Sequence, residues 1–138
     1  MSKQPMWVPS EERKKSTNMY KFMQLVNERH GKNFREYPEL HKWSVENITD
    51  FWALMWEAAE IRASRKYDKV IDDEKKMPGA KWFPGARLNF AENLLRYRDD
   101  RPALVFKGEA VSEAVRYTYA QLYDEVARLA KSLRDGKH

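Results

Sequence analysis

Apolar residues recur at helical spacing in three parts of this chain, which predicts its three main helices. In the first, residues at i, i+3, i+4 and i+7 form the predicted buried stripe: Met19, Phe22, Met23 and Val26. We expect this helix to begin near Ser16 or Thr17, either of which can cap it, and to end at Gly31. Residues 1–15 carry two prolines and a charge run, so we expect them to be extended and flexible.

The densest apolar segment, residues 44–61, predicts the second helix, after a polar connection with a helical turn toward Trp43. Ser44 and Thr49 are both possible N-caps, so the segment is one helix or a short turn followed by a longer helix. Large apolar residues share one side of it, with Trp56 at the flank: Ile48, Phe51, Trp52, Met55 and Ala59. We therefore expect the core to lie here, with Trp52 well buried.

Residues 62–80 are highly charged and predict mostly loop. One short segment, residues 67–72, contains tyrosine, valine and isoleucine, which favour a strand or a well-packed loop. The sequence Met77-Pro78-Gly79 is typical of a turn.

An aromatic stretch, WFPGARLN at residues 82–89, leads into the next predicted helix. It contains a Pro84-Gly85 turn. Asn89 with Glu92 three residues later is close to a capping box, so we expect a helix from there to about Tyr97. Three apolar residues of the stretch are predicted to fix how the chain enters that helix: Trp82, Phe83 and Leu88.

The pattern changes to strands after residue 101. Residues 103–106 and 115–119 are short runs rich in strand-forming residues, which predicts a β-hairpin with a long loop. Thr118 and Gln121 then form a capping box for the last helix, which ends before Gly136. Its apolar stripe spans three turns: Leu122, Val126, Leu129, Ala130 and Leu133. The fold class is therefore α+β, mainly helical.

Composition places the 138 residues among globular domains, with 42% hydrophobic and 34% charged residues. No apolar run approaches the roughly 20 residues that span a bilayer, and we expect no membrane contact. The absence of cysteine and of a secretory signal fits a cytoplasmic protein. The net charge is +5, but the basic residues are spread along the chain and interleaved with acidic ones, as on a solvated surface. We therefore expect no nucleic-acid partner.

A search for catalytic chemistry yields no candidate residue. The histidines at 30, 41 and 138 lack the spacing and the acidic or cysteine partners of a metal site. The glycines form no phosphate-binding loop and the serines no nucleophile elbow. Acid pairs at 72–73 and 99–100 lie in charged loops, where solvation keeps both carboxylates ionised. The sequence therefore predicts no catalytic, cofactor-binding or metal-binding residue.

Four blocks, at residues 43–56, 67–72, 82–95 and 116–134, resemble in order the N-terminal region of acetoacetyl-CoA synthetases, members of the acyl-adenylate-forming superfamily. The last block is general to the superfamily, and the first is similar to the helical cap of short-chain acyl-CoA synthetases. The block WFPGARLNFAENLL most resembles the acetoacetate branch. Acetyl-CoA synthetases differ from it at residues 91–99, which favours acetoacetate over acetate.

The resemblance implies a parent enzyme that joins acetoacetate to CoA. Acetoacetate attacks the α-phosphate of Mg-ATP and releases pyrophosphate, and the CoA thiol then displaces AMP. The family's phosphate loop, adenine and ribose motifs and catalytic lysine have no counterpart in residues 1–138. ATP, Mg²⁺ and CoA are thus expected for the parent and not for this piece, which we expect to be inactive alone.

The resemblance also implies a domain organisation: a flexible N-terminus at 1–15, a helical cap at 16–98 and the truncated start of the AMP-binding domain at 99–138. WFPGARLN would seat the cap against that domain, and the hairpin edges would pair with absent strands or cause self-association. Two alternatives are a fragment of an acetyl- or propionyl-type synthetase and an independent basic helical module that binds protein or an acidic ligand. The residues alone do not identify the substrate, the oligomeric state or any regulation.

Overall fold

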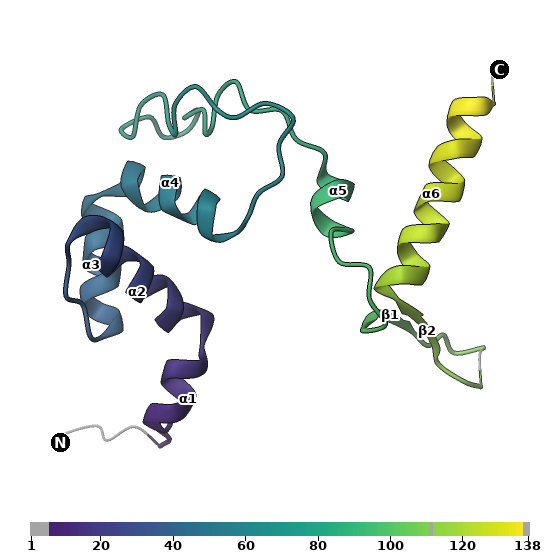
Figure 1. Ribbon diagram of the computed structural model, residues 1–138, viewed down its shortest axis with the longest axis horizontal. Coiled ribbons are helices and arrows are strands. Elements are labelled where there is room, and N and C mark those ends of the chain that lie inside the picture. Colours follow the sequence, from purple (N-terminus) through teal and green to yellow (C-terminus); the bar gives the residue numbers. More distant parts are fainter. Residues whose placement is uncertain (1–5, 111, 137–138) are drawn as a thin grey trace. The chain divides into compact units, whose positions relative to one another are not determined.

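The computed structural model describes residues 6–110 and 112–136, and the predicted α+β class is confirmed (Figure 1). The chain forms two compact units, described separately below. The first contains the residues up to Ile61 and Tyr67–Ala86, and the second contains Arg62–Lys66 and the residues from Arg87 onward. The predicted boundaries at 15/16 and 98/99 concern domains of the family, which this division does not test, and they stay predictions.

The first unit begins with a short helix that the sequence analysis missed, α1 (Glu11–Ser16). Ser10 caps it, because its hydroxyl accepts a hydrogen bond from the Arg13 N–H at 3.2 Å. Glu11 pairs with Lys14 one turn later at 2.6 Å. The expectation of an extended segment over residues 1–15 is therefore wrong for residues 11–15, while residues 1–5 lie outside the described residues.

Helix α2 (Asn18–His30) has the predicted ends. The Thr17 hydroxyl accepts from the Tyr20 N–H at 3.2 Å, and Gly31 adopts the left-handed conformation with φ of 60°. Phe22, Met23 and Val26 are buried as predicted. The fourth residue of the stripe, Met19, is 51% exposed, so its predicted burial is wrong.

Two helices replace the predicted turn and the predicted helix over 44–61: α3 (Tyr37–Glu46) and α4 (Ile48–Ala58). The chain turns between them at Asn47, which is the C-cap of α3 and the N-cap of α4. Its side chain does not cap α4, because Nδ2 donates back to the Trp43 carbonyl at 3.0 Å. Ser44 and Thr49 are not caps: the Ser44 hydroxyl donates back to the His41 carbonyl at 2.8 Å. The expectation of one helix, or of a short turn before it, is corrected to two helices.

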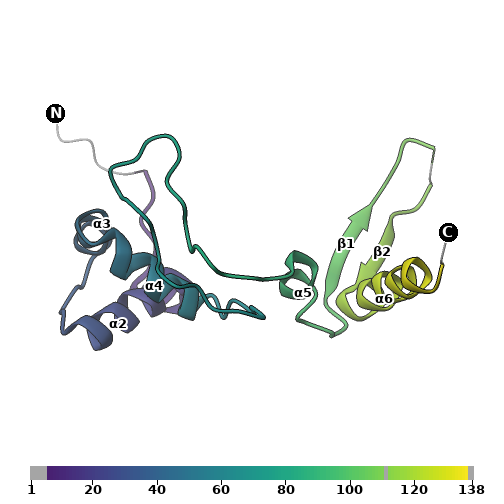
Figure 2. The same ribbon diagram turned by 90° about the horizontal axis from the view of Figure 1, so that it is seen from above.

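The core of the first unit lies where α2, α3 and α4 meet, as Figures 1 and 2 show. Trp43 of α3 is 5% exposed, and Leu54 is the buried residue of α4. Trp52 is 40% exposed, so its predicted burial is wrong. Helix α4 is apolar on almost every side, and the side facing α2 and α3 therefore could not be identified from spacing. Six buried residues form the cluster: Phe22, Met23, Val26, Leu40, Trp43 and Leu54.

Residues 67–72 and 81–86 run past one another as a packed double loop, in agreement with the predicted strand or packed loop. Ile71 and Trp82 form an antiparallel bridge, and the Phe83 N–H donates to the Val70 carbonyl at 2.7 Å. Val70 is 6% exposed. The predicted turns at 77–79 and 84–85 are present, with a cis Met77-Pro78 bond and positive φ at both glycines.

The second unit contains a short helix, a hairpin and a long helix (Figure 2). Helix α5 (Phe90–Leu94) starts at the predicted Asn89 cap but ends three residues before Tyr97. Strands β1 (Pro102–Phe106) and β2 (Val115–Thr118) pair antiparallel, with an irregularity between Pro102 and Leu104, which confirms the hairpin. Helix α6 (Tyr119–Asp135) lies beside it and begins with the predicted capping box of Thr118 and Gln121.

Candidate functional site

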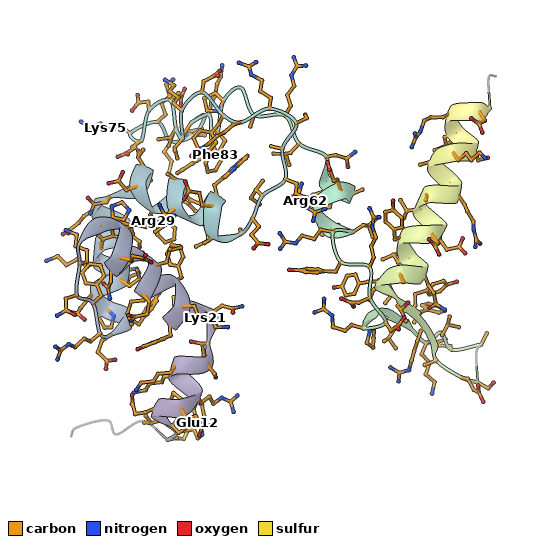
Figure 3. The ribbon with its side chains drawn as sticks, in the orientation of Figure 1. Glu12, Lys21, Arg29, Arg62, Lys75 and Phe83 are labelled. Carbon is orange, nitrogen blue, oxygen red and sulfur yellow. The ribbon has the colours of Figure 1, made fainter. Side chains whose placement is uncertain are left out.

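The aromatic stretch was predicted to fix how the chain enters the helix after Asn89, but Phe83 instead packs against α4 and Tyr67. Its ring lies 4.8 Å from the Trp56 ring of α4 and 5.1 Å from the Tyr67 ring, measured between centroids. Trp56 and Tyr67 are themselves 5.1 Å apart, edge to face. Figure 3 shows Phe83 on the side of the loop that faces α4. Three rings in mutual contact stabilise the double loop against this helix beyond the area that they bury.

The backbone of the stretch turns sharply at Phe83 and Gly85. Phe83 has φ of 47° and Gly85 φ of 85°, both in the left-handed region. A Cβ atom on Gly85 would collide with the Asp68 carboxylate, and the Asp68 N–H donates to the Pro84 carbonyl at 2.9 Å. The positive φ therefore favours glycine at this position, and a larger residue would also displace the Asp68 carboxylate. The other predicted anchors are less buried, with Trp82 45% and Leu88 49% exposed.

In the second unit, one asparagine ties α5 to an upstream loop. The Asn93 side chain accepts from the Arg62 N–H and donates to the Arg62 carbonyl, both at 2.9 Å, and also donates to the Asn89 carbonyl at 2.9 Å. Asn89 itself caps α5 by accepting from the Glu92 N–H at 3.1 Å. Sequence reasoning identified Asn89 but missed Asn93, because an asparagine inside a helix has no spacing that indicates a distant backbone partner.

The acid pair at 72–73 has a structural role in the loop that follows. The Asp72 carboxylate accepts from the Lys76 ammonium at 2.9 Å and from the Lys81 N–H at 2.8 Å. These hydrogen bonds lower the pKa of Asp72 to about 2, with Lys76 as the largest cause. A carboxyl group that stays ionised in this way closes the loop and is unsuited to proton transfer near neutral pH.

The acid pair at 99–100 meets a cluster of arginines and tyrosines. The Arg101 guanidinium forms a bidentate contact with Asp99, at 2.7 and 2.9 Å, which lowers the pKa of that carboxyl group. The same guanidinium lies over the Tyr97 and Tyr119 rings, 4.9 and 5.7 Å from their centroids. These contacts join the segment before β1 to the start of α6 and explain the charges there without catalysis.

The hairpin and α6 carry the most extensive apolar exposure of the second unit. No residue of α6 is buried among those described, and exposure reaches 61% at Leu129 and 73% at Leu133. The predicted stripe is thus present but uncovered toward the C-terminal half of the helix. We give the name α6–hairpin face to the exposed apolar residues of both elements, which include both sides of β1 because successive side chains of a strand alternate: Leu104, Val105, Phe106, Val115, Tyr117, Leu129 and Leu133.

The described residues contain no group of three or more acidic or histidine side chains that could hold a metal ion. The His30 ring lies tilted against the Trp43 ring, with centroids 4.9 Å apart, and the His41 ring lies tilted against that of Tyr37 at 5.9 Å, while His138 lies outside the described residues. Of the described helices, none is long and apolar enough to cross a membrane. The geometry therefore supports packing roles for this chain and offers no assembled catalytic site in its described part.

The comparisons with known proteins agree on one family. Residues 37–94 match the family model described as the acetyl-coenzyme A synthetase N-terminus. The acetoacetyl-CoA synthetase of Macaca fascicularis is 42% identical over 133 residues, which is 95% of this chain and 20% of that protein. The malonamoyl-CoA synthetase of Penicillium aethiopicum is 50% identical over 82 residues, covering 59% of this chain and 11% of that protein.

A solved structure extends the similarity to the fold. The chain matches acetoacetyl-CoA synthetase from Streptomyces lividans with a TM-score of 0.83 and 40% identity, over 96% of this chain and 21% of that one. The chain thus spans about a fifth of the length of the relatives that it matches, and the part matched is N-terminal. The resemblance inferred from the four sequence blocks is confirmed, because nearly the whole chain is similar to the N-terminal region of acetoacetyl-CoA synthetases.

Proposed function

We propose that this chain is the N-terminal scaffold of an AMP-forming ligase that joins acetoacetate to CoA. Support comes from acetoacetyl-CoA synthetases that match 95–97% of the chain at about 40% identity. Acetoacetate and malonamate both carry a carbonyl group two bonds from the carboxylate carbon, and we favour acetoacetate because the malonamoyl relative matches only 59% of the chain. The activity would belong to ketone-body and lipid metabolism in the cytoplasm.

The described residues do not fit the cofactors of such a ligase. No acidic cluster is present among them for Mg²⁺, and the five glycines of the sequence form no phosphate loop. In this proposal ATP, Mg²⁺ and CoA bind to the part of the parent that the chain does not contain. The role left to residues 1–138 is to fold, to present packing surfaces and to support that larger part.

We further propose that the rest of the parent covers the α6–hairpin face. Large apolar side chains exposed as far as Phe106, at 60%, and Leu133, at 73%, are typical of a surface that another protein segment buries. In the described residues each hairpin strand pairs on one side only, so its other edge is free to accept a strand. In the isolated chain the same features would produce self-association.

A substrate comparison tests the proposed function. The complete protein that contains this chain is assayed for pyrophosphate release with acetoacetate, malonamate and acetate, each with Mg-ATP and CoA. We expect kcat/KM for acetoacetate to exceed that for acetate at least about tenfold, a difference of about 1.4 kcal/mol in transition-state binding. A preference for malonamate or acetate would contradict the acetoacetate assignment, and no acid-dependent release would contradict the ligase.

The 138-residue chain alone gives the matched control, and we expect it to release no pyrophosphate. The alternative of an independent basic module makes a different prediction. Such a module would bind an acidic protein or ligand with an affinity that falls steeply with salt, and would do so without the rest of a ligase.

A further inference from the structure

A pocket of about 400 Å³ within the first unit has no part in the proposed function. Its lining comes from the segment before α1, from α1 and α2, and from the start of α3. The volume falls within the range of small-molecule sites, about 300 to 1,000 Å³. Five large apolar side chains contribute to the wall: Trp7, Met19, Tyr20, Met23 and Tyr37.

The wall is apolar yet open to a ligand. Trp7 is 66%, Met19 51% and Tyr37 56% exposed, although each lines the pocket. Aromatic rings offer flat apolar contact area, and methionine adapts to the shape of what it contacts. A ligand with an apolar body would therefore remove much exposed apolar surface from water.

Some charged side chains of the pocket have polar partners, and others have no ion pair. Lys14 is paired with Glu11 at 2.6 Å, and the Glu36 carboxylate accepts from the backbone at the start of α3. Arg13 lies over the Trp7 ring, 5.6 Å from its centroid. Among the described residues no carboxylate lies within ion-pair distance of Arg13 or Arg35, and residues 1–5 contain no Asp or Glu. Neither guanidinium is held in an ion pair, although Arg13 contacts the Trp7 ring and Arg35 interacts electrostatically with Glu39. These two groups are therefore the cations of the pocket that an anion can pair with.

We propose that this pocket binds a small amphipathic carboxylate. The apolar body of the ligand packs against Trp7, Met19 and Tyr37, and its carboxylate pairs with Arg35 and Arg13. A planar guanidinium matches a carboxylate with two parallel hydrogen bonds, which an alcohol or a neutral amide does not reproduce. The apolar wall alone would accept any apolar molecule, and the arginines alone would accept any anion. Their combination favours a ligand that has both an apolar body and a carboxylate.

Octanoate is a suitable probe, titrated into the 138-residue chain by calorimetry at low salt. We expect saturable binding of one octanoate per chain, and octanamide, which has the same tail without the charge, should bind at least about tenfold more weakly. Arg35→Gln should weaken octanoate binding by about tenfold. The matched control Lys42→Gln neutralises an exposed cation of α3 outside the pocket and should leave the affinity unchanged.

A second control tests whether octanoate binds instead to the other exposed apolar surface, the α6–hairpin face. Replacing Leu129 and Leu133 together by lysine alters the α6–hairpin face and should leave octanoate binding intact. The proposal is wrong if octanoate does not saturate, if octanamide binds equally well, or if Arg35→Gln binds as tightly as the unmodified chain. Loss of binding in the double lysine variant would also overturn it. The readout is independent of ligase activity, so failure here leaves the proposed function untouched.

Discussion

The side-chain amide of Asn27 spans the backbone of Phe34. Its Oδ1 accepts from the Phe34 N–H at 2.8 Å, and its Nδ2 donates to the Phe34 carbonyl at 2.9 Å. The two residues lie on either side of the Gly31 turn, so this pair closes the connection from α2 to α3. Phe34 is thereby held against the core, where its ring lies 6.4 Å from that of Trp43.

The first prediction concerns this amide. Asn27→Asp keeps the acceptor but places a carboxylate oxygen against the Phe34 carbonyl, so we expect the free energy of unfolding to fall by about 1 to 3 kcal/mol. Urea unfolding followed by circular dichroism measures the change. The control is Asn33→Asp, at an exposed position in the same connection, and equal losses in both variants would contradict the assigned role.

The second prediction separates two tryptophans that the sequence does not distinguish. Trp43 is 5% exposed and Trp52 is 40% exposed. Trp43→Ala should therefore cost about 3 to 5 kcal/mol of stability, and Trp52→Ala clearly less. Thermal unfolding of the two variants gives the comparison. A larger shift of the midpoint for Trp52→Ala would show that the core has been placed on the wrong side of α4.

The third prediction follows from the pKa of Asp72, lowered from 3.8 to about 2. A carboxyl group with a lowered folded-state pKa stabilises the fold above its ordinary pKa, and this contribution is lost as pH falls through about 2. Asp72→Asn lacks it at every pH. We therefore expect the unmodified chain to be more stable than Asp72→Asn at pH 5, and the difference to shrink between pH 4 and pH 2.

Unfolding at a series of pH values measures that difference. Glu28→Gln, at an exposed position of α2, serves as the control for the loss of one carboxylate. A gap between the unmodified chain and Asp72→Asn that is constant from pH 5 to pH 2 would contradict the role of the Lys76 and Lys81 contacts.

The fourth prediction addresses self-association of the isolated chain. Because the α6–hairpin face is apolar and exposed, the average mass in sedimentation should rise with concentration. The double lysine substitution at Leu129 and Leu133 should reduce the rise. Arg128→Lys, on the charged side of α6, should not change it. A monomer at all concentrations would show that this face does not mediate association.

How far the sequence predicted the fold depended on how local the signals were. The ends of α2 and the start of α6 follow from Thr17, Gly31 and Thr118, whose capping partners lie within a few residues. The break at Asn47 was not predictable in this way, because apolar residues continue on both sides of it. Helix α1 was missed because its charged residues resemble a solvated loop, and its stability rests on the Ser10 cap and the Glu11–Lys14 ion pair.

In the candidate site, too, local features were predictable from the sequence and distant partners were not. Phe83 was predicted as an anchor for the entry into the next helix, but its partners Trp56 and Tyr67 are distant in sequence and could not be identified. Asn93 and Asp72 act on backbone groups that no local pattern indicates. The exposure of Leu129 could not be predicted either, because a helical stripe indicates which side of a helix is apolar and not whether another part of the protein covers that side.

The most direct test of the central claim uses a cysteine at position 129. The chain contains no cysteine, so Leu129→Cys is its single thiol, and the alkylation rate of that residue, followed by peptide mass spectrometry, reports access to the α6–hairpin face. The rate is measured in the isolated chain and in a chimera that joins it to the remaining four fifths of the Streptomyces lividans enzyme, with Arg128→Cys as the control on the polar side. We predict alkylation at least about tenfold slower in the chimera for position 129 and nearly unchanged for position 128. Equal rates at position 129 in both proteins would contradict the account.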